Sequence, residues 1–207
     1  MRHKRALLAG VIAAGALLTS AAMADAASPW EHEDVFGQGM GGPTVAEDGA
    51  SILRTDNGVI ASVSMPTPEP GSYAYPVGPN ASGVPGHPEA FSLWVFIFFN
   101  PEACDGDCDP ADLQVNPDVV AGAFNAAGHI VGGPNLNMTG RVDETSTLFG
   151  GPNAESIGQA LDLGFTIADA DVHVAVAPHG ALDPALLPAS ITTPVGNPSF
   201  WWLALFE

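Results

Sequence analysis

Positive charge is what this sequence lacks most. Its 207 residues include 23 aspartates and glutamates but only 5 lysines and arginines, which gives a formal net charge of −18. A chain this acidic offers no electrostatic surface to nucleic acid or to an anionic membrane surface. Charged residues make up only 14% of the chain, however, and apolar residues 46%. The composition therefore excludes a disordered acidic tail and indicates a folded domain.

The sequence also lacks an apolar run long enough to span a bilayer. Three basic residues in the first five positions precede a short apolar stretch, Leu7 to Leu18, and Ala22-Met23-Ala24 follows it. This pattern predicts a cleaved signal peptide over residues 1–24, of a kind that suits bacterial export. We therefore expect a secreted or periplasmic protein.

Removal of residues 1–24 would deepen the charge imbalance. The remaining 183 residues keep all 23 acids but only Arg54 and Arg141, so the formal charge becomes −21 and no lysine is left. Most carboxylates then have no cationic side chain to pair with. The acids either form a solvated surface, as in proteins of salty surroundings, or hold a bound divalent cation.

Glycine and proline, at 24 and 19 residues, predict many turns and little helix. The sequence indicates an all-β protein, an antiparallel β-sandwich or partly open barrel of about 7–8 strands. Residues 25–50 are rich in glycine and acids and are interpreted as a flexible arm, followed by a single β-domain over residues 51–207. Residues 65–90, rich in proline, are expected to form a long loop.

The strand signals are short and separated by turn residues. The strongest is the aromatic run over residues 91–99, which predicts a central strand buried on both faces. The others are a hairpin over 51–55 and 59–64, a second hairpin over 119–124 and 128–131, a polar edge strand over 136–142, a half-buried strand over 172–177 and a last buried strand over 200–206. One short helix is expected within 153–163, with Asn153 or Ser156 as its cap.

Cysteine is scarce, since Cys104 and Cys108 are the only two. In an exported chain this pair predicts a disulfide, whose main effect would be to hold a turn. The three-residue spacing and the absence of nearby basic residues argue against a redox pair. Zinc would need two further soft ligands nearby, and the sequence has none there.

A cluster of aspartates surrounds the second cysteine, at Asp105, Asp107, Asp109 and Asp112. Alternating carboxylates are how an oxygen cage for Ca²⁺ begins, so these four residues are a candidate calcium site. The match to an EF-hand ends at Pro110, which replaces the required glycine. The alternative is a solvated acidic turn.

Three histidines, His129, His173 and His179, form a candidate zinc or copper site if neighbouring strands bring them together. Asp171 is a candidate outer partner of that site. Six residues of extended chain separate His173 from His179 by about 20 Å, however, and a buried structural histidine is the commoner case. The two interpretations stay open at this point.

The sequence contains no recognisable catalytic motif, such as a nucleophile elbow, a zinc-protease pair or a phosphate loop. We therefore expect a non-catalytic binding or structural module, with calcium as the one candidate cofactor. Its partner would be an extracellular ligand or protein that the sequence does not specify. The alternative is a metal-dependent extracellular enzyme that uses the three histidines.

Roughly residues 91–183 resemble an uncharacterised family of small exported β-domain proteins. The resemblance is carried by Phe99-Asn100-Pro101, Cys104, Cys108, Asp112-Leu113, Asn116-Pro117, Gly128-His129, Val172-His173 and His179-Gly180. Ala181 departs from the family pattern, which has proline after the last of these motifs. There is a fainter similarity to the CHRD module, an extracellular β-domain. The resemblance implies an exported β-domain and no particular reaction.

Overall fold

The computed structural model describes residues 28–39, 41–73, 88–192 and 200–207, so the predicted signal peptide lies outside the described residues. Nine strands are described: β1 (Glu31–Phe36), β2 (Thr44–Thr55), β3 (Gly58–Pro66), β4 (Glu89–Phe98), β5 (Ala121–Val131), β6 (Asn135–Asp143), β7 (Leu148–Phe149), β8 (Asp171–Ala181) and β9 (Trp202–Phe206). The helices are short: α1 (Asp112–Val115), α2 (Ile157–Asp162) and α3 (Ala189–Thr192). In these residues no helix has the length and apolar character needed to cross a membrane.

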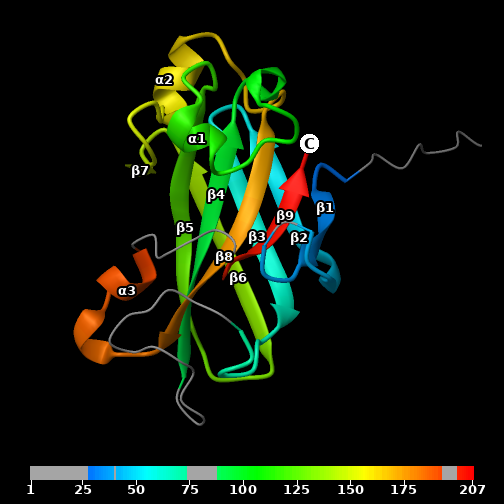
Figure 1. Ribbon diagram of the computed structural model, residues 1–207, viewed down its shortest axis with the longest axis vertical. Helices are drawn as coiled ribbons and strands as arrows, with labels where there is room; N and C mark the ends of the chain where they lie inside the picture. Colours follow the sequence, from blue (N-terminus) through cyan, green and yellow to red (C-terminus); the bar gives the residue numbers. More distant parts are fainter. Residues whose placement is uncertain (1–27, 40, 74–87, 193–199) are drawn as a thin grey trace, which may run out of the picture.

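The strands form a single antiparallel sheet in the order β6-β3-β2-β1-β9-β8-β4-β5-β7. The sheet curls into a half-barrel, as Figure 1 shows, with α1 and α2 at one end and α3 at the side of the other. The all-β prediction with little helix is confirmed. Of the two predicted architectures, the structure corresponds to the partly open barrel.

The curl follows from the connection between β5 and β6. These two strands lie near opposite edges of the sheet, yet only residues 132–134 join them. The edges must therefore approach one another, and β6 packs against β5 so closely that a Cβ on Gly140 would lie 2.3 Å from the Ala126 carbonyl oxygen. Glycine at position 140 is thus what lets the two backbones meet.

The second predicted hairpin, over residues 119–131, is wrong. The structure has one continuous strand, β5, and the residues expected to turn contain a β-bulge instead. Trp94 pairs with Asn125 and Leu93 with Ala127, so that Ala126 is the extra residue. A bulge increases the bend of its strand, and this one lies where β6 approaches.

The sheet buries apolar side chains on both faces at its centre. Along β4, every second side chain, beginning with Phe91 and Leu93, faces the inner core. The side chains between them, beginning with Trp94, face a second apolar cluster on the other side of the sheet, which we call the outer cluster. Every residue of β4 is buried. The predicted central strand, β4, is confirmed, because it is paired on both sides, and so is the predicted last buried strand, β9. β8 is more buried than the half-buried strand expected.

The interpretation of residues 25–50 as a flexible arm is wrong over much of that range. Residues 31–36 form β1, which pairs with β2 along its length and with β9 at Phe36. Val35 fills the inner core, while the neighbouring acids point outward. The acids that indicated an arm therefore occupy the exposed positions of a paired strand, and the glycines lie where the chain bends.

Several local predictions are confirmed. β2 and β3 form the expected hairpin around Asp56-Asn57, and β6 is the expected edge strand. Ser156 caps α2 in a capping box with Gln159.

Candidate functional site

The loop over residues 100–118 covers the outer face of the sheet. Cys104 and Cys108 form the predicted disulfide, with an S–S distance of 2.06 Å. Cys108 and Leu113 are both buried in the outer cluster, together with the outward-facing side chains of β4 and β8. The loop is partly exposed and partly packed on the sheet: Asp105 and Asp107 are exposed, whereas Cys108 and Leu113 are buried.

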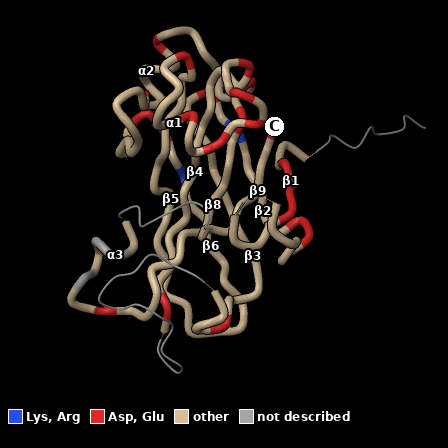
Figure 2. Tube along the Cα trace, viewed as in Figure 1, with Lys and Arg blue, Asp and Glu red and all other residues tan. Residues whose placement is uncertain are grey.

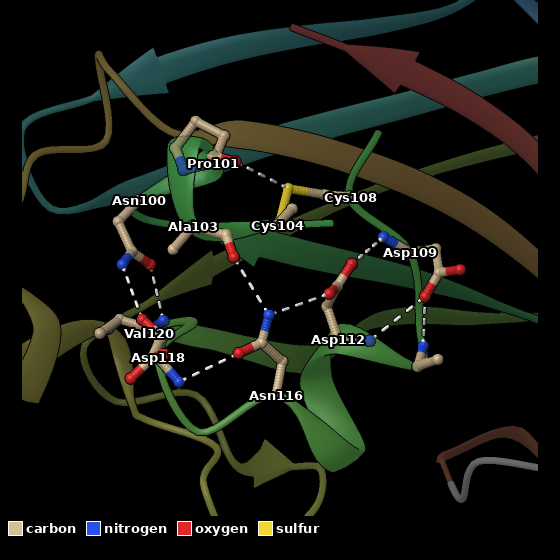
Figure 3. The surroundings of a disulfide bond; sticks show 11 residues. Asn100, Pro101, Ala103, Cys104, Cys108, Asp109, Asp112, Asn116, Asp118 and Val120 are labelled. Carbon is tan, nitrogen blue, oxygen red and sulfur yellow. Dashed lines mark hydrogen bonds between the residues drawn. A yellow bond between two sulfur atoms is a disulfide. The ribbon is translucent and has the colours of Figure 1, made fainter. Parts of the chain in front are cut away.

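Two asparagines fix the backbone of this loop, as Figure 3 shows. Asn100 donates to the Asp118 carbonyl at 2.9 Å and accepts from the Val120 N–H at 2.6 Å. Asn116 donates to the Ala103 carbonyl at 3.0 Å and so ties the two sides of the loop together. The backbone that carries α1 is therefore fixed at several points.

Two of the four candidate calcium ligands cap the backbone instead. The Asp109 carboxylate accepts from the N–H groups of Ala111 and Asp112, at 2.6 and 3.2 Å. The Asp112 carboxylate in turn accepts from the Asp109 N–H at 3.0 Å. This reciprocal pair resembles a capping box at the start of α1. It accounts for both side chains without a metal ion.

The other two, Asp105 and Asp107, are exposed. Figure 2 shows acidic residues gathered at the end of the half-barrel that carries α1 and α2. Among the residues that the structure describes, no group of three or more His, Cys, Asp or Glu side chains is arranged to hold a metal ion. Two of the four carboxylates therefore bind backbone N–H groups, and the other two belong to exposed residues.

The structure does not bring the three candidate histidines together, so the zinc or copper interpretation is not supported. On the sheet, His173 pairs with Phe96, whereas His179 lies six residues farther along β8, roughly 20 Å away if the strand is extended. His129 pairs with Phe91 on the far side of β4, about two strand spacings from β8. A single ion bound at about 2 Å from each imidazole cannot bridge these separations.

His173 lies under the disulfide loop, where its ring packs 4.9 Å from that of Phe98. Burial lowers the pKa of His173 to about 4, although the charges of Asp109 and Asp107 oppose that shift. Asp171, the expected outer partner, lies at the start of the same strand, and burial raises its pKa. His173 is thus a neutral core residue near pH 7.

His179 occupies a β-bulge in β8, since Ala90 pairs with Gly180 and Phe91 with Pro178. Its Nε2 lies 2.7 Å from the Ser92 hydroxyl, and the Trp94 indole N–H donates to the same oxygen at 2.7 Å. The Ser92 hydroxyl thus bridges the Trp94 indole and the His179 imidazole. Burial lowers the pKa of His179 to about 4, which keeps the imidazole neutral.

A hydroxyl beside an imidazole can act as a nucleophile with its base, but this pair is placed for structure. The Ser92 side chain is completely buried in the middle of the sheet. A substrate carbonyl has no access to it, so the hydroxyl and imidazole join β4 to the bulge of β8 rather than perform catalysis.

An apolar groove lies on the outer face of the sheet, and we call it the aromatic groove. It lies between α1 and the turn that follows β7, with a volume of about 510 Å³. It is lined by Trp94, Phe96, Pro110, Leu113, Gln114, Val115, Ala123, Phe149, Gly150, Gly151, Pro152 and Trp201.

Aromatic side chains from three separate segments build the floor of the aromatic groove. Trp94 stacks on Trp201 with ring centroids 6.2 Å apart and meets Phe149 edge-on at 5.0 Å. Phe96 lies 5.8 Å from Trp201. Such mutually packed rings are held in place before any ligand arrives.

The aromatic groove could not be predicted from the sequence, because its residues come from distant parts of the chain. The available signal was the alternation along the central strand, which puts Trp94 and Phe96 on one face.

Comparisons with protein-family models, with curated proteins and with solved structures found no match. The resemblance to a family of exported β-domains stays a prediction.

Proposed function

We propose that this protein is an exported, non-catalytic binding module that holds a small, neutral, largely apolar molecule in the aromatic groove. The observation that carries the proposal is the groove itself, a preformed hollow with four aromatic side chains in its lining. Its volume of about 510 Å³ falls within the range of small-molecule sites, about 300–1,000 Å³.

The chemistry of the lining favours a neutral ligand. None of the twelve lining residues is charged, and Gln114 supplies the one side-chain amide. The acidic residues at the same end of the half-barrel disfavour an anion. A molecule with a ring and one or two hydrogen-bonding groups matches such a surface, because rings stack on Trp and Phe faces.

Export is the second part of the proposal. The predicted signal peptide and the Cys104–Cys108 disulfide both suit an oxidising compartment outside the cytoplasm, either the periplasm or the medium. The loop over residues 100–118 supports a binding role, because its hydrogen bonds and buried residues fix the α1 wall of the groove. A fixed wall reduces the entropy that a ligand must overcome on binding.

The test uses N-phenyl-1-naphthylamine, a neutral aromatic probe whose fluorescence rises in apolar sites. We expect saturable binding to the purified protein, and we expect Val115→Asp to weaken it by roughly tenfold or more. Val115 is 74% exposed at the groove, so the new charge disturbs the ligand and not the core.

The matched control is Leu163→Asp, at an apolar residue that is 64% exposed and outside the groove lining. This variant should bind the probe as the unmodified protein does. Equal binding by both variants and the unmodified protein would place the probe elsewhere and contradict the proposal, as would the absence of saturable binding.

A further inference from the structure

A second site lies at the other end of the barrel, where Glu89 begins β4. The Glu89 side chain has the parity of Phe91 and Leu93, which face the inner core. Only 3% of the residue is exposed, and neither carboxyl oxygen has a hydrogen-bond partner among the described residues. The hydroxyl of Thr67 is buried there as well, and the described chain offers it no partner either.

Such a carboxyl group is unusual, because nearly all buried polar atoms in proteins are hydrogen-bonded. Burial raises the pKa of Glu89, since the charged form loses its hydration. Neither of the two arginines in the described residues is paired with Glu89. Arg54 binds Glu31, and Arg141 binds Asp143. The carboxyl group thus has acceptor capacity that these residues do not use.

Glu89 and Thr67 both line one cavity, which we call the Glu89 cavity. Its volume is about 300 Å³, and Pro68, Pro70 and Val131 form much of its wall. A divalent cation needs six or more oxygen ligands and favours several carboxylates. Only one carboxylate lines the cavity, so a monovalent organic cation fits better than a metal ion.

We propose that the Glu89 cavity binds the ammonium group of a small primary alkylamine. The ammonium donates hydrogen bonds to the Glu89 carboxylate and the Thr67 hydroxyl oxygen, and the alkyl chain lies against Pro68, Pro70 and Val131. One negative charge meets one positive charge, and the unpartnered acceptors gain donors. The site is separate from the aromatic groove, so either proposal stands without the other.

The test is calorimetric titration of the purified protein with n-butylammonium chloride at constant ionic strength. We expect one saturable site and a higher midpoint of thermal unfolding with the ligand present. Glu89→Gln should weaken binding roughly tenfold or more, because it removes a charge-assisted hydrogen bond. Glu69→Gln changes a nearby exposed acid and should leave affinity unchanged.

Three comparison ligands decide the chemistry. Tetramethylammonium carries the charge but cannot donate, and we expect it to bind at least tenfold more weakly than butylammonium. Saturable binding of CaCl₂ that Glu89→Gln abolishes would overturn the proposal in favour of a metal ion. Stronger binding of Nα-acetyl-lysine methylamide than of butylammonium would overturn it in favour of a polypeptide lysine.

If Glu89→Gln does not fold, Thr67→Val provides the second variant, and it should also weaken butylammonium binding. Unchanged affinity in a folded Glu89→Gln protein would overturn the proposal, as would no saturable binding to the unmodified protein.

Discussion

The Arg54 guanidinium donates through Nε to the Glu31 carboxylate at 2.9 Å, and it thereby joins β2 to β1. The same side chain donates to the carbonyl oxygens of Ile167, Ala170 and Phe206. Arg54 thus ties the first strand, the loop before β8 and the end of β9 to one point. In a chain so poor in cations, one of the two basic residues beyond the predicted signal peptide has a structural role.

Arg54→Ala should lower the free energy of unfolding by about 2–4 kcal/mol, because it leaves a carboxylate and three carbonyls without their donor. Arg54→Lys should recover only part of the loss, since an ammonium cannot reproduce the planar fork. Urea unfolding at pH 7 measures both.

Arg141→Ala is the control. Its side chain is half-exposed, and the expected loss is within about 0.5 kcal/mol. An equal loss in the two alanine variants would contradict the assigned role.

The sequence was sufficient to identify those elements whose signal is local. The aromatic run of β4 and the Asp56-Asn57 turn each carry their own pattern, and both lie where expected. The disulfide also follows from local spacing and compartment. These features depend on residues within about ten positions of one another, which is the distance over which sequence patterns are informative.

Features that depend on register could not be predicted. Val35 is a core residue only because β1 lies between β2 and β9, and its acidic neighbours conceal that pairing. The aromatic groove joins Trp94, Phe149 and Trp201, which are far apart in sequence. The histidines failed as a site for the same reason, because strand register and not residue type decides which side chains meet.

The aspartate cluster around Cys108 should stabilise the protein without calcium. Asp109→Ala removes the acceptor of two backbone N–H groups at the start of α1 and should cost about 1 kcal/mol. Asp105→Ala, at an exposed position, should cost less than about 0.5 kcal/mol. Thermal unfolding of the unmodified protein in EGTA and in millimolar CaCl₂ should give the same midpoint. A midpoint raised by calcium, and no longer raised in Asp109→Ala, would restore the predicted calcium site.

Stability should fall with acidification because of His173. Its pKa is about 4 in the folded protein against 6.5 for an unperturbed histidine, so the unfolded chain binds a proton first as the pH drops. The stability is fully present above pH 6.5 and is lost progressively toward pH 4, by about 2–3 kcal/mol at pH 4.5. His173→Phe keeps a ring beside Phe98 and cannot titrate. Urea unfolding at pH 7 and 4.5 should therefore show a smaller decrease for this variant. Equal decreases in the two proteins would mean that His173 is protonated in the fold.

The closure of the half-barrel depends on the close approach of β6 to the bulge of β5. Gly140→Ala puts a methyl group 2.3 Å from the Ala126 carbonyl oxygen, and backbone on both sides prevents an easy shift. We expect a loss of about 2–3 kcal/mol in urea unfolding, as for overpacked cores. Gly132→Ala is the matched control in the turn between the same strands, where a Cβ meets nothing within 4 Å. It should change stability by less than about 0.5 kcal/mol, and it can even increase it by restricting the unfolded chain. If Gly140→Ala were as stable as the control, β6 would not need to pack against β5, and the short β5–β6 turn alone would account for the curl.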